Sequence, residues 1–365
     1  MLHIVYSGIK RATVEKRRLL IDSLDSVFRP GNVEKSSMEI EFPHLFSEEN
    51  IHNTFYIDDG TSPVSQASVL LSKVSINGAV LDVASLGSVS TLKEHRHKGL
   101  STRIINEIIR VYTESKIDLL LVSGEIELYT KLNCVKTGRV YTGIAHDLPG
   151  CKNYTVKKTN IEERIKNSKD YQQIYRKEKF RYLRTEKDFK TLLDSVWFKR
   201  IGFRMELFEI KNAGEDLVAY VVAFNKTGNN ELIVMEYAGS RRAISSSLGK
   251  IAEIMECNTI RLKINGDDIE FLDICSSMEI ELKEGNSQGT VRVLNSKSIF
   301  QKLEPLIREK SGSEFDIKMG ADESWSFTPG DVDKNINGHA ELTHFIFDYN
   351  GLGLPLMFTD DLNYI

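Results

Sequence analysis

The stretch that decides the fold is Val89-Ser90-Thr91-Leu92-Lys93-Glu94-His95-Arg96-His97-Lys98-Gly99-Leu100-Ser101. A β-like run ends in a short basic loop, and a long helix with one apolar face is predicted to begin near Gly99. The first N–H groups of a helix have no internal partner and attract anions. Gly99 has no Cβ, so a phosphate can approach its backbone closely. Arg96 and Lys98 add positive charge, and the loop therefore predicts a pyrophosphate site.

The surrounding pattern predicts an α/β unit. Two long β-like runs flank Asn77-Gly78, a type I′ hairpin signal because both turn positions need positive φ. After the loop, apolar residues from Leu100 to Tyr112 recur at helical spacing. The apolar run 118–122 predicts a strand that is covered on both faces, and a further strand is expected at 139–145. The first third therefore places several strands before its best helix.

A surface loop without a ligand is the alternative for this stretch, because basic residues and a glycine often precede helices. Two other phosphate motifs are missing, since the chain contains neither G-x-x-x-x-G-K-[ST] nor G-x-G-x-x-G. Later in the chain the order strand, turn, helix, strand returns between about residues 217 and 264. A polar, lysine-rich connector at 150–170 separates the two units.

Composition excludes several classes of protein. The 365 residues are 41% hydrophobic and 27% charged, which is ordinary for a globular protein of two or three domains. A net charge of −4 argues against sequence-independent nucleic-acid binding. No apolar run is long enough to span a bilayer, and the N-terminus lacks a signal-peptide pattern. The four cysteines have no zinc spacing, so a cytoplasmic protein with reduced thiols and no metal is expected.

The run from Val89 to Ser101 resembles motif A of the GNAT superfamily of N-acetyltransferases, whose pattern is [QR]-x-x-G-x-[GA] after a strand. Arg96 and Gly99 match, whereas Ser101 is small but departs from Gly or Ala. The resemblance implies that acetyl-CoA binds here. The strand end would pair with the pantetheine arm, and the loop amides would hold the pyrophosphate. The implied cofactor-binding residues are Val89, Ser90, Thr91, Arg96, His97, Lys98, Gly99, Leu100, Ser101 and Thr102.

A narrower resemblance covers most of the chain. The segments 42–50, motif A and 128–132 are similar, in this order, to enhanced-intracellular-survival-type acetyltransferases. This implies an α/β (α+β) fold: tandem GNAT-like mixed sheets with flanking helices, then a small C-terminal α+β sterol-carrier-like domain. The second lobe is expected to be degenerate, because its strand–turn–helix connection at 237–242 lacks the spacing of motif A. The implied domains are catalytic (1–150), degenerate (151–288) and C-terminal (289–365).

Amide formation from a thioester requires a general base and a general acid. By resemblance, Tyr129 is the acid that protonates the departing thiolate, and the carboxylate of Ile365 is the base. A packing tyrosine and an ordinary packed tail are the alternatives. Asp82 and Glu125 are lower-ranked candidates for the base.

The acceptor is expected to be a primary amine. Glu34, Glu39, Glu41, Glu48 and Glu49 cluster in a segment that borders the substrate mouth in the resembled family, and an acidic rim would attract a cation. An aminoglycoside, a polyamine or a lysine-like group fits equally well, and ordinary solvated charge is the alternative.

Two hypotheses follow. The first is an active, cytoplasmic, bacterial-type N-acetyltransferase, compatible with a homo-oligomer and without nucleic-acid or membrane partners. The second is a non-catalytic CoA-binding or interaction module built on a duplicated fold. His95 and His97 are interpreted as anion contacts or exposed side chains rather than as bases.

Overall fold

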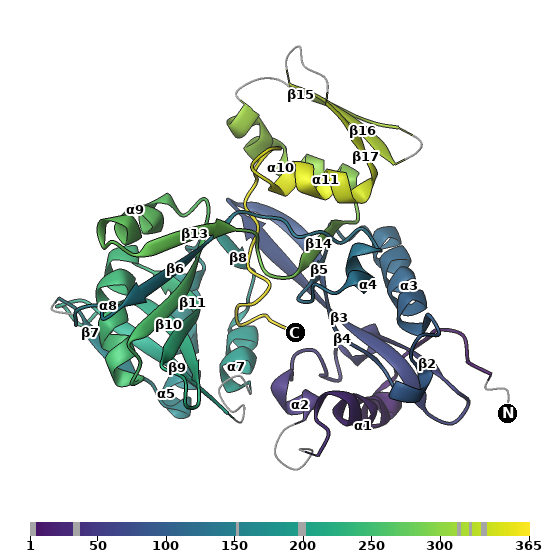
Figure 1. Cartoon of the computed structure of the whole chain (residues 1–365), viewed down its shortest axis with the longest axis horizontal. Coiled ribbons are helices and arrows are strands. Elements are labelled where there is room, and N and C mark those ends of the chain that lie inside the picture. The colour runs from purple at the N-terminus through teal and green to yellow at the C-terminus, as the bar shows by residue number, and fades with distance from the viewer. Residues whose placement is uncertain are drawn as a thin grey trace. The chain divides into compact units, whose positions relative to one another are not determined.

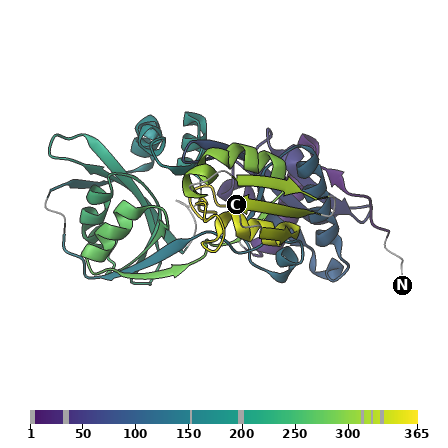
Figure 2. The ribbon, with the colours of Figure 1, turned by 90° about the horizontal axis from the view of Figure 1, so that it is seen from above.

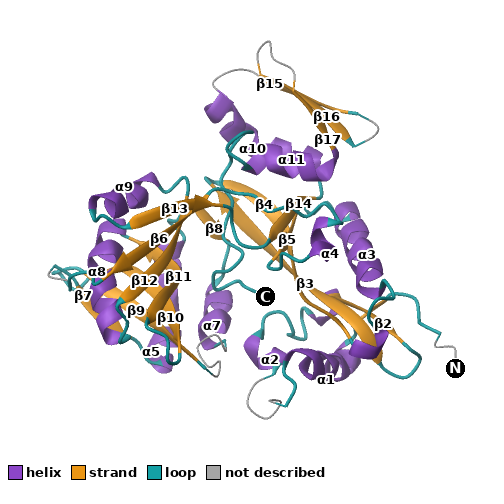
Figure 3. Cartoon of the chain, in the orientation of Figure 1, coloured by secondary structure: helices purple, strands orange, loops and turns teal. Residues whose placement is uncertain are grey.

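The computed structural model describes residues 5–31, 37–150, 153–195, 202–311, 315–320, 323–329 and 334–365 (Figures 1 and 3). The chain divides into two compact units. The first contains Met1–Gly138, Ser287–Leu354 and Ile365, and the second contains Arg139–Asn286 and Pro355–Tyr364. Within the described ranges, no helix has the length and apolar character needed to cross a membrane.

The first unit is built on a mixed sheet with the strand order β1-β2-β3-β4-β5-β14. Neighbouring strands are antiparallel except β4 and β5, which run parallel and are connected through a helix, as a parallel pair requires. The strands are β1 (Lys10–Arg11), β2 (Thr54–Asp58), β3 (Pro63–Ile76), β4 (Ala79–Thr91), β5 (Leu119–Val122) and β14 (Thr290–Val293).

Helix α3 (Leu100–Glu114) covers one face of this sheet, and its buried Ile104 and Ile108 pack with Phe55 and Leu120. Helix α1 (Arg17–Phe28) contacts β3 and β4. Shorter helical segments are η1 (Val14–Lys16), α2 (Met38–Glu41), η2 (Ile51–Asn53), η3 (Lys93–His95) and α4 (Glu127–Thr130).

The C-terminal part of the first unit adds a small antiparallel sheet, β15-β16-β17, with two helices (yellow-green to yellow in Figure 2). Phe327 on β16 stacks edge-on with Phe345 on α11, which joins this sheet to its helix. The elements are α10 (Ser296–Ser311), β15 (Phe315–Met319), β16 (Ser324–Pro329), β17 (Lys334–Asn337) and α11 (Gly338–Phe347).

The second unit has its own mixed sheet, in the order β13-β6-β12-β11-β10-β9-β7. Alternate residues of β10 face opposite sides, as the period of a strand requires. Ala219 and Val221 join the core under α8, whereas Tyr220 and Val222 join the core under α6 and α7.

Its strands are β6 (Val140–His146), β7 (Thr155–Lys158), β9 (Phe203–Lys211), β10 (Leu217–Lys226), β11 (Glu231–Gly239), β12 (Thr259–Asn265) and β13 (Glu281–Gly285). The short strand β8 (Phe180–Tyr182) is not part of this sheet. Its helices are α5 (Ile161–Lys166), α6 (Ser168–Tyr175), α7 (Glu186–Asp194), α8 (Arg241–Ile254) and α9 (Ile269–Ser277).

The predicted fold class is confirmed: the chain has two mixed α/β sheets and a small C-terminal sheet. The Asn77-Gly78 hairpin also forms, with φ of +47° and +93° between paired Ile76 and Ala79. The predicted division into domains 1–150, 151–288 and 289–365 stays a prediction.

Three local expectations need correction. The sequence favours a strand at residues 3–9, but residues 5–9 form none and the strand β1 covers only Lys10–Arg11; positions 3 and 4 lie outside the described residues. The strand expected at 139–145 forms as β6, but it pairs with β12 and β13 of the second sheet. Three short strands, β15 to β17, lie in the stretch up to Asn337, for which the sequence predicts structure only weakly.

Candidate functional site

A cavity of about 340 Å³ lies where β4 ends and α3 begins. It brings together most of the predicted cofactor residues and the predicted acid, whereas Thr102 is not among the residues that line it. The lining residues are Val27, Phe28, Val89, Ser90, Thr91, His95, Arg96, His97, Lys98, Gly99, Leu100, Ser101, Ile126, Leu128 and Tyr129.

The loop presents backbone N–H groups to this cavity. Gly99 is the N-cap of α3, with φ of +71°, and no side chain within the described segments caps this helix. His97 also has a positive φ, +61°. Two left-handed residues within three positions give the loop a tight turn into the helix. An anion at this point would meet uncapped N–H groups and the positive end of the helix dipole.

The basic side chains of the loop are held by local contacts. The Nε of Arg96 donates to the carbonyl of Thr91 at 3.2 Å, and the Nζ of Lys98 donates to the hydroxyl of Tyr6 at 2.8 Å. That hydroxyl also contacts Nδ1 of His95 at 3.0 Å. His95 is buried, 9% exposed, so the interpretation of this residue as merely exposed was wrong. The hydrogen bond between Tyr6 and His95 orients the imidazole instead.

Strands β4 and β5 separate beside the cavity. Their pairing runs from Val83 with Leu119 to Leu86 with Val122, where β5 ends. β4 continues to Thr91. A bulge in β4 accompanies the separation: Ser88 has φ of +54°, and the register against β3 shifts between Gln66 and Ser68. The last five residues of β4 thus continue without β5, which leaves their edge open to an extended ligand.

Ile365 lies at the inner end of this separation. The Oγ of Ser123 donates a hydrogen bond of 2.7 Å to the main-chain oxygen of Ile365. On the other strand, a Cβ added to Gly87 would lie 3.0 Å from Cγ1 of Ile365. Gly87 and Ser123 directly follow Leu86 and Val122, the last paired residues. Ile365 therefore occupies the point where the two strands part, and it is buried.

Tyr129, on α4, packs against the residue that follows Ser123. Its side chain is buried and lines the cavity. A Cβ on Gly124 would come within 2.6 Å of its Cε2, so only glycine leaves room for the ring. Gly124 follows Ser123, which binds Ile365. The two predicted catalytic residues thus contact consecutive residues after β5.

The two alternative bases are paired elsewhere. A hydrogen bond from Lys136 lowers the pKa of Glu125, which also accepts the N–H of Gly289 at 3.1 Å. Burial raises the pKa of Asp82, but hydrogen bonds from Lys302 and Lys73 outweigh it and lower the pKa overall. Carboxylates with lowered pKa values bind protons weakly, so both are poor bases.

The acidic segment is partly neutralised. Glu39 forms an ion pair with Arg17, and the buried Glu41 forms one with Arg29. Glu34 lies outside the described residues. Ion pairs of this kind hold α2 against α1. The acidic rim therefore rests on fewer charges than the sequence predicts.

The corresponding connection of the second unit also borders a cavity, of about 590 Å³, but its N–H groups have side-chain partners. The Oγ of Ser240 caps α8 by accepting from the N–H of Ala243 at 3.2 Å. The Oε1 of Glu178 accepts from the N–H of Gly239 at 2.8 Å, and Arg241 pairs with the same carboxylate at 2.5 Å. Within the described residues, the start of α8 is thus capped, whereas the start of α3 is not.

Comparison with known proteins identifies the first part of the chain. The family model described as an acetyltransferase (GNAT) domain matches residues 8–135. This segment spans β4, the loop, α3 and Tyr129. Residues 8–135 form a GNAT acetyltransferase domain. The protein is therefore an acyltransferase. The full sequence has no significant match among curated proteins.

Solved structures share the fold of this chain over most of its length. A probable N-acyltransferase from Enterococcus faecalis V583 has a TM-score of 0.63 and 11% identity, covering 93% of this chain and 89% of that one. A GCN5-related N-acetyltransferase from Anabaena variabilis has a TM-score of 0.60 and 12% identity, with coverage of 92% and 86%. Eis1 from Mycobacterium abscessus has a TM-score of 0.61 and 10% identity, with coverage of 91% and 84%.

The sequence prediction missed the residues that surround Ile365. Gly87 carried a usable signal, because a glycine inside a strand often marks the close approach of another segment. Ser123 carried none, because its partner lies 242 residues away in the sequence.

Proposed function

We propose that the GNAT domain transfers the acetyl group of acetyl-CoA to a primary amine. The observation that carries this proposal is the cavity in which the uncapped start of α3, the edge of β4 and Tyr129 meet. Arg96 to Ser101 would hold the pyrophosphate through backbone N–H groups and positive charge. Val89 to Thr91 would pair with the amide groups of the pantetheine arm along the open edge of β4.

The reaction forms one C–N bond and breaks one C–S bond. A neutral amine attacks the thioester carbonyl, and the tetrahedral intermediate expels the CoA thiolate. Tyr129 is proposed to donate a proton to this sulfur, because a phenol has an ordinary pKa near 10, close to that of a thiol. The carboxyl group of Ile365 is proposed to accept the proton that the amine loses. Its place beside Ser123, one residue from Gly124 and the Tyr129 ring, supports this pairing of roles.

The acceptor is proposed to be an amine on a small molecule or a lysine-like side chain. Aminoglycosides, polyamines and lysine-bearing compounds all present such a group. Because Glu39 and Glu41 are paired with arginines, the acceptor class rests on the transfer chemistry more than on an acidic rim.

Thiol release from acetyl-CoA with a panel of amines tests the proposal. At least one amine should accelerate release, and Tyr129→Phe should lower kcat by about 10²-fold or more while leaving CoA binding intact. Tyr112→Phe is the matched control, because its hydroxyl donates to Asn53 within the same core, outside the cavity lining. If CoA stabilises the protein against heat but no amine is acetylated, a non-catalytic CoA-binding module replaces this proposal.

Removal of Tyr364 and Ile365 tests the base. The truncated protein should still bind CoA, since neither residue lines the cavity at the loop. Its kcat should fall by about 10²-fold. Unchanged turnover would exclude Ile365 as the base and leave the role of Tyr129 standing.

A further inference from the structure

The open edge of β4 forms a slot with a closed inner end. Along an extended strand each residue advances about 3.3 Å, so Gly87 lies roughly 7 Å deeper than Val89. Val89 lines the cavity, whereas Gly87 does not. At the deep end Ile365 packs against Gly87, and Ser123 holds it from the other strand. A ligand that extends from the loop along β4 therefore meets the side chain of Ile365.

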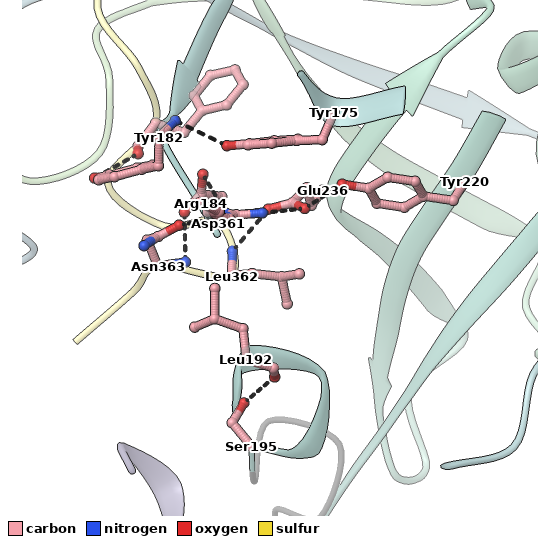
Figure 4. A network of polar contacts seen from close by, with 11 residues as sticks. Tyr175, Tyr182, Arg184, Leu192, Ser195, Tyr220, Glu236, Asp361, Leu362 and Asn363 are labelled. Carbon is pink, nitrogen blue, oxygen red and sulfur yellow. Dashed lines mark hydrogen bonds and ion pairs between the residues drawn. The ribbon is translucent and has the colours of Figure 1, made fainter. Parts of the chain in front are cut away.

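The residues before Ile365 belong to the second unit and are bound within it. Leu362 is fully buried in the core that contains Tyr220 and Val222. The Nε of Arg184 donates to Oδ1 of Asn363 at 2.6 Å, as Figure 4 shows. Arg184 is fixed in turn by two hydrogen bonds of 2.8 Å to Glu236.

Contacts also hold the earlier part of the same segment. The Nδ2 of Asn265 donates to the carbonyl of Leu356 at 2.7 Å, and Lys263 forms an ion pair with Asp360. The segment 356–363 is thus bound at several points of the second unit.

We propose that Ile365 sets the acyl specificity of the enzyme by closing the inner end of the slot between β4 and β5. This inference rests on the proposed acyl transfer from CoA, because it concerns the same site. A thioester beside Tyr129 directs its acyl group towards Gly87 and Ile365. An acetyl group fits in front of the isoleucine side chain, and each added methylene collides with it.

A series of acyl-CoA thioesters tests the proposal: acetyl, propionyl, butyryl and hexanoyl. For the wild-type protein, kcat/KM should fall about tenfold for each of the first added methylenes, since a rigid apolar pocket discriminates to about this extent. Ile365→Ala keeps the main-chain groups and removes three carbons. Its ratio of butyryl to acetyl turnover should rise by about tenfold or more.

Ile126→Ala is the matched control. Ile126 lines the outer part of the cavity and is 59% exposed, so the same truncation there should leave the ratio of butyryl to acetyl turnover unchanged.

Binding separates this proposal from the transfer reaction. Dissociation constants of the same thioesters, measured by calorimetry without an acceptor, should weaken with acyl length in the wild type and level off in Ile365→Ala. If no amine is acetylated yet this pattern appears, the proposed function fails, whereas the proposal that Ile365 limits acyl length is supported. Two results would contradict that proposal: equal binding and turnover of acetyl-CoA and hexanoyl-CoA by the wild type, or the same length dependence in Ile365→Ala.

Discussion

Among single residues, Gly99 combines a left-handed backbone conformation with open space at the position of a Cβ. Its φ of +71° disfavours any side chain, and nothing lies within 4 Å of the position that its Cβ would occupy. The open space belongs to the cavity lined by the loop. Glycine therefore suits the turn into α3 and leaves the space in which we propose that a phosphate binds.

Gly99→Ala should cost about 1 kcal/mol of folding free energy, because an L-residue pays for the left-handed conformation. It should also weaken acyl-CoA binding by about tenfold, because the new methyl group enters the cavity. Gly78→Ala is the matched control: Gly78 has φ of +93° and equally open surroundings, but it lies in a hairpin turn. Urea unfolding and calorimetry measure both effects. Equal losses of acyl-CoA affinity in the two variants would contradict the assignment.

Asp361 is a buried residue whose pKa changes on folding. Burial raises its pKa from the ordinary value of 3.8 to about 7, although Arg184 acts in the opposite direction. Glu236 and Lys263 also act on it electrostatically, the first raising and the second lowering its pKa. The folded state therefore binds a proton more tightly than the unfolded chain does.

The stability that this proton contributes is fully present below pH 3.8 and is lost as the pH rises through about 7. Asp361→Asn, which cannot ionise, should gain on the order of 1–2 kcal/mol relative to the wild type between pH 5.5 and 7.5. This range stays below about 8, the value to which burial lowers the pKa of Lys263. Denaturant unfolding of both proteins measures the difference, and a gap that is constant with pH would contradict the shift.

The loop residues and Tyr129 could be predicted from the sequence, because they match the spacing of a known motif. The contacts of Ile365 with Gly87 and Ser123 could not, because they join positions more than 240 residues apart without any local periodicity. Likewise, the arginine partners of Glu39 and Glu41 are set by helix packing rather than by sequence spacing.

At the scale of elements, helix α10 is joined to the first sheet by a buried charge cluster. The Nζ of Lys302 lies 2.7 Å from Asp82 and 2.6 Å from Asp118. Asp118 is fully buried and also accepts the backbone N–H of Asp82 at 2.7 Å. The cluster links a helix near the C-terminal end of the chain to β4 and to the residue before β5.

Lys302→Met should destabilise the protein by about 3 kcal/mol, because it leaves a buried carboxylate without its cation. Lys297→Met is the control on the same helix, since Lys297 is exposed and should change stability by less than about 0.5 kcal/mol. Urea unfolding compares the two. Similar small effects of both substitutions would show that the cluster contributes little.

Local patterns predicted the β3–β4 hairpin and α3 because turn chemistry and helical periodicity are encoded within a few residues. The partners of β6 were not predictable in this way. Its alternating pattern suits any half-buried strand, and only its antiparallel pairing with β12 and β13 assigns it to the second sheet. The short strands β15 to β17 contain polar residues that mask their period.

In the whole molecule, each of the two units has a strand that leads directly into a helix, but the groups at the start of that helix differ. The start of α3 has no side-chain cap within the described residues, whereas Ser240 caps α8 and Glu178 binds the adjacent N–H. This asymmetry could be anticipated from the sequence only as a missing motif. The Glu178 carboxylate at the N–H of Gly239 is visible only in the structure.

We expect one molecule of acyl-CoA to bind per chain. Isothermal titration with CoA should give a stoichiometry close to one, because the helix start at the cavity of the first unit is uncapped, whereas Ser240 caps α8 at the cavity of the second unit. Gly99→Ala should weaken this single transition. A second transition that persists in Gly99→Ala would place a further CoA site in the second unit.

The Glu178 carboxylate has a further consequence for any free anion that meets the second unit. It is covalently part of the chain and is held by Arg241 as well as by the N–H of Gly239. A tethered group acts at a fixed local concentration, commonly in the millimolar range or above, that dilution cannot reduce. We therefore expect Glu178 to compete with any free anion for the N–H of Gly239 and for Arg241.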